Sequence, residues 1–256
     1  PKAKVAEERL REVNSEIDVR GTVADVNHTN IESLIKGATV VVDATDNMDT
    51  RFLVNDACVK NGVPWVYGGA VGVTGMILPV VKDGPCLRCV FPSLPQPGDL
   101  PTCDTVGIIN TLPSAVASLE VTEAFKIMLG EEPTKELMVL DLWQAELQKV
   151  KVKKNPKCAC CGRRDFIYLQ ARERKLVASL CGRNAVQIVP VKPMTHGLGD
   201  MKRNLGKLGK VDMEDGVLRF RTKGVELTVF SDGRTIVGGT TDISKAKTIF
   251  SKYVGD

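Results

Sequence analysis

The sequence lacks several features that would mark broad classes of protein. No apolar run in its 256 residues approaches the roughly 20 that a membrane span needs. Pro1-Lys2-Ala3-Lys4 carries no secretory signal pattern, and the net charge of +4 is spread without a basic block. We therefore expect a cytoplasmic protein that binds neither membrane nor nucleic acid. With only two histidines, any metal site must depend on cysteine, and the chain has eight.

The first part of the chain alternates between helical and strand patterns. Helical spacing predicts helices over 3–13 and 50–61, and alternation over 17–23 predicts a strand. The β-branched run Val40-Val41-Val42 and the segment 63–67 predict strands buried on both faces. Short links between such elements are typical of an α/β layer with a parallel sheet.

Later segments change in character. A strongly apolar helix is predicted over 114–129, in which Glu120, Glu123 and Lys126 form one polar stripe. Residues after 164 read as a small α+β unit of a size that suits a second domain. We expect domains at 1–164 and 165–256.

Two pairs of cysteines have matched spacing. Cys86 and Cys89 form one C-x-x-C knuckle, and Cys158 and Cys161 form another. Two such turns brought together give the tetrahedral sulfur shell that zinc prefers, and a closed shell leaves no place for a catalytic water. We expect structural zinc. A redox dithiol or unpaired core cysteines are the alternatives, and Cys160 could replace Cys161 as a ligand.

Cys103 differs from the remaining cysteines. It closes a proline-rich loop that spans 91–102, and long loops inside compact domains are often functional. A thiol on such a loop can reach a substrate, which makes Cys103 a candidate nucleophile. A buried thiol without function is the alternative.

An acidic loop follows the strand at Val40–Val42. Asp43 and Asp46 would lie at the carboxyl end of that strand, where α/β sheets bind ligands. Two carboxylates suit Mg²⁺ with its phosphates, and Arg51 could meet a phosphate or carboxylate. In the alternative, Asp46 and Asn47 cap a helix and Arg51 lies on a solvated face.

The chain resembles the ThiF/MoeB/HesA family of E1-like enzymes, which activate ubiquitin-like proteins. The resemblance runs from about Pro1 to Gly162, the first two-thirds of the chain. It is carried by Pro1-Lys2-Ala3, Asp43-Ala44-Thr45-Asp46-Asn47 with Arg51 and Asn55, Gly68-Gly69-Ala70, Gly84-Pro85-Cys86-Leu87-Arg88-Cys89-Val90-Phe91-Pro92, Thr102-Cys103, and Asn155-Pro156 with Cys158, Cys161 and Gly162.

The resemblance implies a Rossmann-like sheet and an adenylyltransferase that uses ATP and Mg²⁺. By this resemblance Asp46 matches the essential aspartate of the adenylation site, with Asn47 and Arg51 beside it. Lys2 matches a lysine that contacts ATP phosphates, and the four knuckle cysteines match zinc ligands. Cys103 matches the cysteine that links covalently to the activated carrier in many members.

The resemblance also implies partners. The substrate would be the C-terminal glycine of a β-grasp, ubiquitin-like sulfur-carrier protein, serving thiamine, molybdopterin or tRNA thiolation. A cysteine desulfurase is an expected sulfur donor, and the expected assembly is a homodimer.

One family feature is missing from the sequence. A Gly-x-Gly-Gly-x-Gly loop, whose backbone N–H groups would cradle the nucleotide, does not occur. On family analogy we interpret the chain as a fragment lacking about the first 80 residues, or as part of a split or cleaved protein. We predict that this chain alone is inactive. The alternatives in other functional classes are a zinc-stapled scaffold that binds a carrier without chemistry and an NAD-dependent oxidoreductase with a redox dithiol.

Overall fold

The computed structural model describes residues 1–95, 99–170, 177–180, 184–190 and 197–255, and for 177–180 the backbone only. The chain packs as two compact units: a central unit of residues 26–172, and a terminal unit that joins residues 1–25 to 173–256. The boundary at 164 and 165 stays a prediction. None of the helices in the described ranges combines the length and apolar character that crossing a bilayer requires.

A five-stranded sheet forms the middle of the central unit. Its strands lie in chain order: β1 (Val41–Val42), β2 (Trp65–Val71), β3 (Thr74–Val80), β4 (Leu137–Asp141) and β5 (Glu146–Val150). β1 and β2 run parallel, joined by helix α3 (Met48–Asn61), and each later strand is antiparallel to the one before. The parallel arrangement predicted for this unit therefore holds for one pair of strands.

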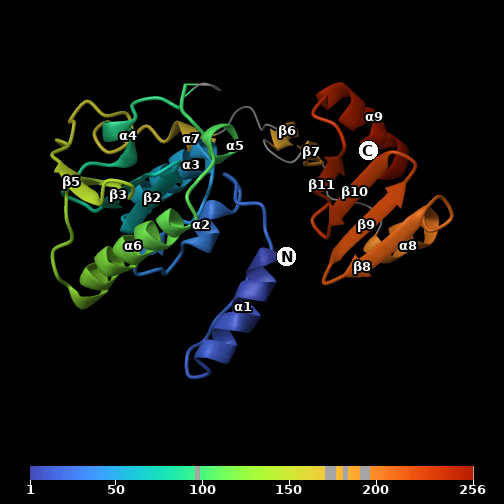
Figure 1. The fold of residues 1–256 in the computed structure, drawn as a ribbon, viewed down its shortest axis with the longest axis horizontal. Coiled ribbons are helices and arrows are strands. Elements are labelled where there is room, and N and C mark those ends of the chain that lie inside the picture. Colours follow the sequence, from blue (N-terminus) through green and yellow to red (C-terminus); the bar gives the residue numbers. More distant parts are fainter. Residues whose placement is uncertain (96–98, 171–176, 181–183, 191–196, 256) are drawn as a thin grey trace. The chain divides into compact units, whose positions relative to one another are not determined.

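Helices cover both faces of this sheet (Figure 1). On one face α3 packs with the short helices α2 (Ile31–Leu34), α4 (Leu87–Val90) and α7 (Ile167–Gln170). On the other face lies α6 (Thr111–Leu129). Alternate residues of β2 serve the two cores, since Trp65 belongs to the α3 side and Val66 to the α6 side.

Two predictions about strands are wrong. Residues 17–23 contain no strand, and β1 is not buried on both faces, because Val42 is 42% exposed. Among the described residues, β1 pairs with β2 on one side only. Its other edge is therefore without a neighbouring strand in the part of the chain that the structure describes.

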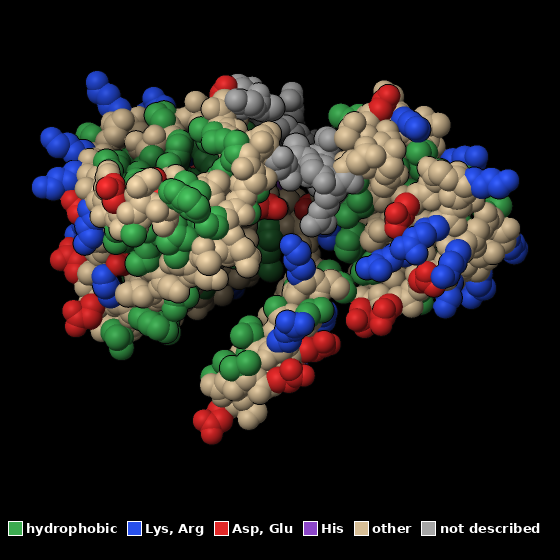
Figure 2. All heavy atoms as spheres, viewed as in Figure 1, with side chains coloured by type: hydrophobic (Ala, Val, Ile, Leu, Met, Phe, Trp, Pro, Cys, Tyr) green, Lys and Arg blue, Asp and Glu red, His purple; other side chains and the backbone are tan. Residues whose placement is uncertain are grey.

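The polar stripe of α6 lies opposite to where helical amphipathicity would place it. Glu120 and Glu123 are buried against the body of the unit. Apolar side chains take the solvent side instead, and Figure 2 shows hydrophobic side chains gathered on that face over α6. The most exposed of them, at 41–79% exposure, are Val121, Phe125, Met128 and Leu129.

The terminal unit holds the second sheet. Its strands are β6 (Val177–Leu180), β7 (Ala185–Ile188), β8 (Lys210–Glu214), β9 (Val217–Thr222), β10 (Val225–Phe230) and β11 (Thr235–Gly238), in the order β6-β7-β11-β10-β9-β8. All neighbouring pairs are antiparallel. Helices α8 (Leu198–Leu205) and α9 (Ile243–Tyr253) pack on it through Met201 and Phe250, and helix α1 (Lys2–Val13) belongs to the same unit. The expected α/β fold with a second, smaller α+β part is confirmed.

Candidate functional site

The loop after β1 is held in shape by hydrogen bonds that its own side chains accept. The Oδ1 atom of buried Asp43 accepts hydrogen bonds from the Thr45 N–H at 2.8 Å and the Thr45 hydroxyl at 2.7 Å. Asn47 is the N-cap of α3, and its Oδ1 accepts the Thr50 N–H at 2.8 Å. Asp46 is exposed, with Asn47 Nδ2 at 3.4 Å from its Oδ1. The loop therefore presents one outward carboxylate at the carboxyl end of β1.

Arg51 fixes this loop to the next strand. Its Nε donates to Asp43 Oδ2 at 2.9 Å, and its Nη2 donates to the carbonyl oxygens of Thr45 at 2.6 Å and Gly68 at 2.8 Å. The guanidinium also lies 5.3 Å from the centre of the Tyr67 ring. With its side chain only 11% exposed, Arg51 does not lie on a solvated face. Its contact with a phosphate stays a prediction.

Glu120 approaches the same strand from the α6 side. It is 4% exposed, and a Cβ added to Gly68 would lie 2.3 Å from its carboxyl carbon, so any larger residue there would force the Glu120 carboxyl group to shift. Burial and the neighbouring Asp43 carboxylate raise the pKa of Glu120 to about 8, against the attraction of Arg51. Its Oε1 has no hydrogen-bond partner among the described residues. The strand predicted over 63–67 stops one residue short of Gly68, so the sequence analysis missed a glycine inside a strand, which marks a close approach.

Cys103 opens the short helix α5 (Cys103–Val106), which Thr102 caps through a reciprocal pair of hydrogen bonds with Thr105. The thiol is exposed, and its Sγ lies 3.4 Å from the carbonyl oxygen of Ala70 at the end of β2. The alternative of a buried thiol is therefore wrong. Ala70 lies two residues along β2 from Gly68, whose carbonyl oxygen accepts a hydrogen bond from Arg51. The predicted nucleophile and the acidic loop therefore face the same end of this sheet.

The two knuckles meet in the central unit. The sulfur atoms of Cys86, Cys89, Cys158 and Cys161 all lie within 4.8 Å of one another. Cys86 and Cys158 are 3.7 Å apart, and Cys89 and Cys161 are 3.4 Å apart. A tetrahedral zinc with Zn–S bonds of about 2.3 Å requires sulfur separations of about 3.8 Å, so this donor set fits such an ion with small adjustments. Four thiols in this arrangement could hold a metal ion.

The remaining cysteines divide as follows. Cys58 is buried in α3, where desolvation raises the pKa of its thiol to about 12, and packing explains it as expected. Cys160 is also fully buried and stands outside the four-sulfur group. Cys181 and His196 lie outside the described residues. Lys2 is exposed on α1, in the terminal unit, and its contact with nucleotide stays a prediction.

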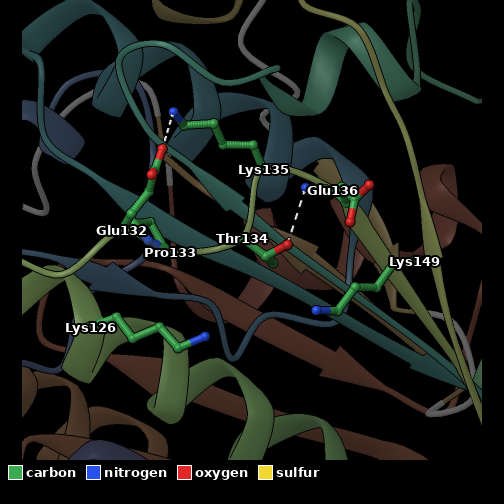
Figure 3. Close-up of a pocket in the computed structure, with 7 residues that line it drawn as sticks. All are labelled: Lys126, Glu132, Pro133, Thr134, Lys135, Glu136 and Lys149. Atoms are coloured by element: carbon green, nitrogen blue, oxygen red, sulfur yellow. Dashed lines mark hydrogen bonds and ion pairs between the residues drawn. The ribbon is translucent and has the colours of Figure 1, made fainter.

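Two hollows mark the surface of the central unit. One, about 390 Å³, lies at the end of α6, and none of the predicted site residues lines it (Figure 3). It is lined by Lys126, Glu132, Pro133, Thr134, Lys135, Glu136 and Lys149. The other is an apolar groove of about 360 Å³ beside β1, where Ile31, Ile35 and Val41 are among the lining residues.

Known proteins resemble this chain over much or all of its length. Sulfur carrier protein ThiS adenylyltransferase of Bacillus subtilis (strain 168) is 40% identical over 262 residues, which cover 100% of this chain and 76% of that protein. SAMP-activating enzyme E1 of Haloferax volcanii is 38% identical over 164 residues, 63% of this chain and 61% of that protein. This chain thus spans less than two thirds of the Haloferax protein.

Solved structures share the fold at lower identity. The crystal structure of E. coli MccB with ATP superposes with a TM-score of 0.53 and 20% identity, over 63% of this chain and 51% of that one. A model of the ThiF family matches residues 1–160, which include the acidic loop, Cys103 and three of the four clustered thiols. The chain belongs to the ThiF family.

Proposed function

We propose that this chain carries the adenylation site of an enzyme that activates a ubiquitin-like sulfur-carrier protein at its C-terminal glycine. The observation that carries the proposal is the outward carboxylate of Asp46 at the carboxyl end of β1, on a loop that Asp43 and Arg51 hold rigid. Relatives named adenylyltransferases of sulfur carrier proteins support it.

The chemistry follows from the weakness of a carboxylate as an electrophile. An oxygen of the carrier's terminal carboxylate attacks the α-phosphorus of ATP, and pyrophosphate leaves with the electrons of the broken P–O bond. The transition state gathers negative charge, which cationic groups must offset. Mg²⁺, when bound, would neutralise phosphate charge, and Asp46 suits it because Mg²⁺ takes one or two carboxylates with phosphate oxygens and water. Lys2 is the proposed protein cation at the phosphates.

Cys103 is the proposed acceptor of the activated carrier. Its thiolate, or a persulfide on it, attacks the carbonyl carbon of the acyl-adenylate, and AMP leaves. The exposure of the thiol and its place at the end of β2 support this role.

The four clustered thiols are the proposed site of one structural zinc ion. The donor set is all sulfur and offers four ligands, so no position remains for water. The knuckles are about 70 residues apart in sequence, so zinc would tie distant segments together, as structural zinc sites do when their binding energy contributes to folding. Reduced thiols fit the cytoplasmic setting that we propose.

We further propose that the enzyme acts as a homodimer and receives sulfur through a desulfurase, in thiamine, molybdopterin or tRNA-thiolation metabolism. The exposed apolar side chains of α6 support a second copy of the chain as the partner, since large exposed apolar patches mark interfaces. Light scattering of the full-length protein measures this: a monomer at micromolar concentration would contradict it.

ATP–pyrophosphate exchange by the full-length enzyme with candidate carrier proteins tests the adenylation. We expect exchange that depends on the carrier's terminal glycine and falls about 100-fold in Asp46→Asn. Asp83→Asn, which changes an exposed carboxylate elsewhere in the central unit, is the matched control and should exchange normally. Full activity of Asp46→Asn would contradict the assignment of Asp46. No exchange with any carrier would support a scaffold instead.

A further inference from the structure

A single side chain of α3 connects the two cysteine knuckles. Asn55 is fully buried, and its Oδ1 accepts the Leu87 N–H at 2.9 Å. Its Nδ2 donates to the Sγ of Cys160 at 3.2 Å. Leu87 directly follows Cys86 in the first knuckle, and Cys160 directly precedes Cys161 in the second. One amide group thus contacts both turns that carry the four-sulfur group.

Cys160 contacts α3 a second time. Its thiol also lies close enough to interact with the carboxylate of Asp56, the residue after Asn55, and with the thiol of Cys86. A thiol can accept a hydrogen bond from an amide, as the Cys160 thiol does from Asn55. Because Cys160 is buried and engaged by the helix, it is a structural thiol beside the proposed metal site and not one of its ligands.

Asp56 ties the same helix to the first knuckle and to the segment that follows the second knuckle. Its Oδ1 lies 3.4 Å from Nη1 of Arg88, which stands between Cys86 and Cys89, and its Oδ2 accepts the Tyr168 N–H at 3.2 Å. Arg88 Nη1 also donates to the carbonyl oxygen of Asp165, just after the second knuckle, at 3.1 Å. The pair of Asp56 and Arg88 is almost completely buried.

We propose that Asn55 is a positioning residue of the metal centre, fixing the two knuckles to each other and to α3 through its amide and the Cys160 thiol. This inference rests on the proposed zinc site. The same helix begins at Met48, and its N-cap Asn47 directly follows Asp46. The contacts of Asn55 therefore connect the metal centre to the same helix that carries the acidic loop.

Zinc release tests the proposal in the full-length protein. Zinc freed into excess chelator is followed with a colour-forming indicator in wild type and in Asn55→Ala. We expect Asn55→Ala to hold one zinc per chain, since its four thiols remain, and to release it about tenfold faster, as loss of an outer contact does at metal sites. Asn61→Ala is the matched control, because Asn61 lies on the same helix but binds Glu32. Equal release from Asn55→Ala and Asn61→Ala would overturn the proposal.

Variants of Cys160 separate a positioning thiol from a ligand. Cys160→Ser keeps a donor and an acceptor and should retain zinc with nearly wild-type release, whereas Cys160→Ala should release it faster. Cys161→Ser should lose stoichiometric zinc. Loss of zinc in Cys160→Ser would make Cys160 a ligand and overturn the assignment.

Amide hydrogen exchange in metal-free protein tests the role of Asn55 without depending on zinc. In protein stripped of metal, Asn55→Ala should speed amide exchange in peptides that cover Leu87, and Asn61→Ala should not, because only Asn55 accepts the Leu87 N–H. If wild-type protein takes up no zinc, the zinc proposal fails by itself, and this comparison still decides the role of Asn55. Unchanged exchange in Asn55→Ala would reject it.

Discussion

Replacing Glu120 by glutamine should stabilise the central unit near neutral pH. The carboxyl group is buried, one of its oxygens has no hydrogen-bond partner among the described residues, and its pKa rises from 4.5 to about 8. Below pH 4.5 the folded and unfolded states both hold the proton, so no penalty exists. As pH rises towards 8, the unfolded state releases the proton first, and the free energy of unfolding falls. Above pH 8 the loss is complete.

The rise in the pKa of Glu120 sets how much the free energy of unfolding falls. At 1.36 kcal/mol for each pKa unit, the penalty is about 3 kcal/mol at pH 7 and about 5 kcal/mol at pH 9. Glutamine has nearly the same shape and does not ionise, so Glu120→Gln should match wild type at pH 4 and exceed it by about 3 kcal/mol at pH 7.

Urea denaturation from pH 4 to pH 9, followed by tryptophan fluorescence, measures this difference. Both tryptophans, Trp65 and Trp143, lie in the central unit, so the signal reports on that unit. Glu123→Gln is the control on the same helix. Glu123 accepts Lys126 Nζ at 2.6 Å and the Thr134 N–H at 2.8 Å, and its replacement should cost about 1 kcal/mol. Parallel loss of stability in wild type and Glu120→Gln between pH 5 and pH 8 would refute the reasoning.

Three further outcomes follow from the site. Cys103→Ala in the full-length enzyme should retain ATP–pyrophosphate exchange but form no covalent adduct with the carrier, as measured by mass spectrometry; an adduct at another residue would contradict its role. Zinc content by elemental analysis should be one per chain, and removing it with a chelator should lower the unfolding temperature of the central unit, with easier loss as pH falls because the thiolates become protonated; less than half an equivalent in reduced protein would contradict the metal site. The 256-residue chain by itself should show no ATP–pyrophosphate exchange, because its sequence contains no glycine-rich nucleotide loop; exchange without another chain would refute that prediction.

The sequence could predict features that depend on local patterns. The spacing of Cys86 and Cys89 and of Cys158 and Cys161 anticipated the four-sulfur group, because each pair must share a tight turn. Helix α3 was expected over 50–61 and runs from Met48 to Asn61, ending at Gly62 in the left-handed conformation. These signals act within a few residues and need no partner.

Features that depend on contacts between residues far apart in the chain could not be predicted from the sequence. Helical periodicity could show that Glu120 and Glu123 share a stripe, but not that the stripe faces the sheet, because a glycine in β2 makes room for one carboxyl group and Thr134 partners the other. Arg51 was assigned to a ligand or to solvent, whereas the carbonyl oxygen of Gly68, from the next strand, holds it inside. Spacing favoured Cys161 over Cys160 as a ligand, and the four-sulfur group contains Cys161. Spacing could not show that Cys160 instead faces α3.

One edge of β1 pairs with no strand in the described ranges, and this has a practical consequence for the purified polypeptide. A strand with unpaired backbone N–H and C=O groups offers a template to any other extended segment, and exposed Val42 and the apolar groove beside it increase the attraction. At high protein concentration, molecules would pair along this strand edge and aggregate. Storage at low concentration, or a peptide designed to pair with this strand edge, should reduce the aggregation.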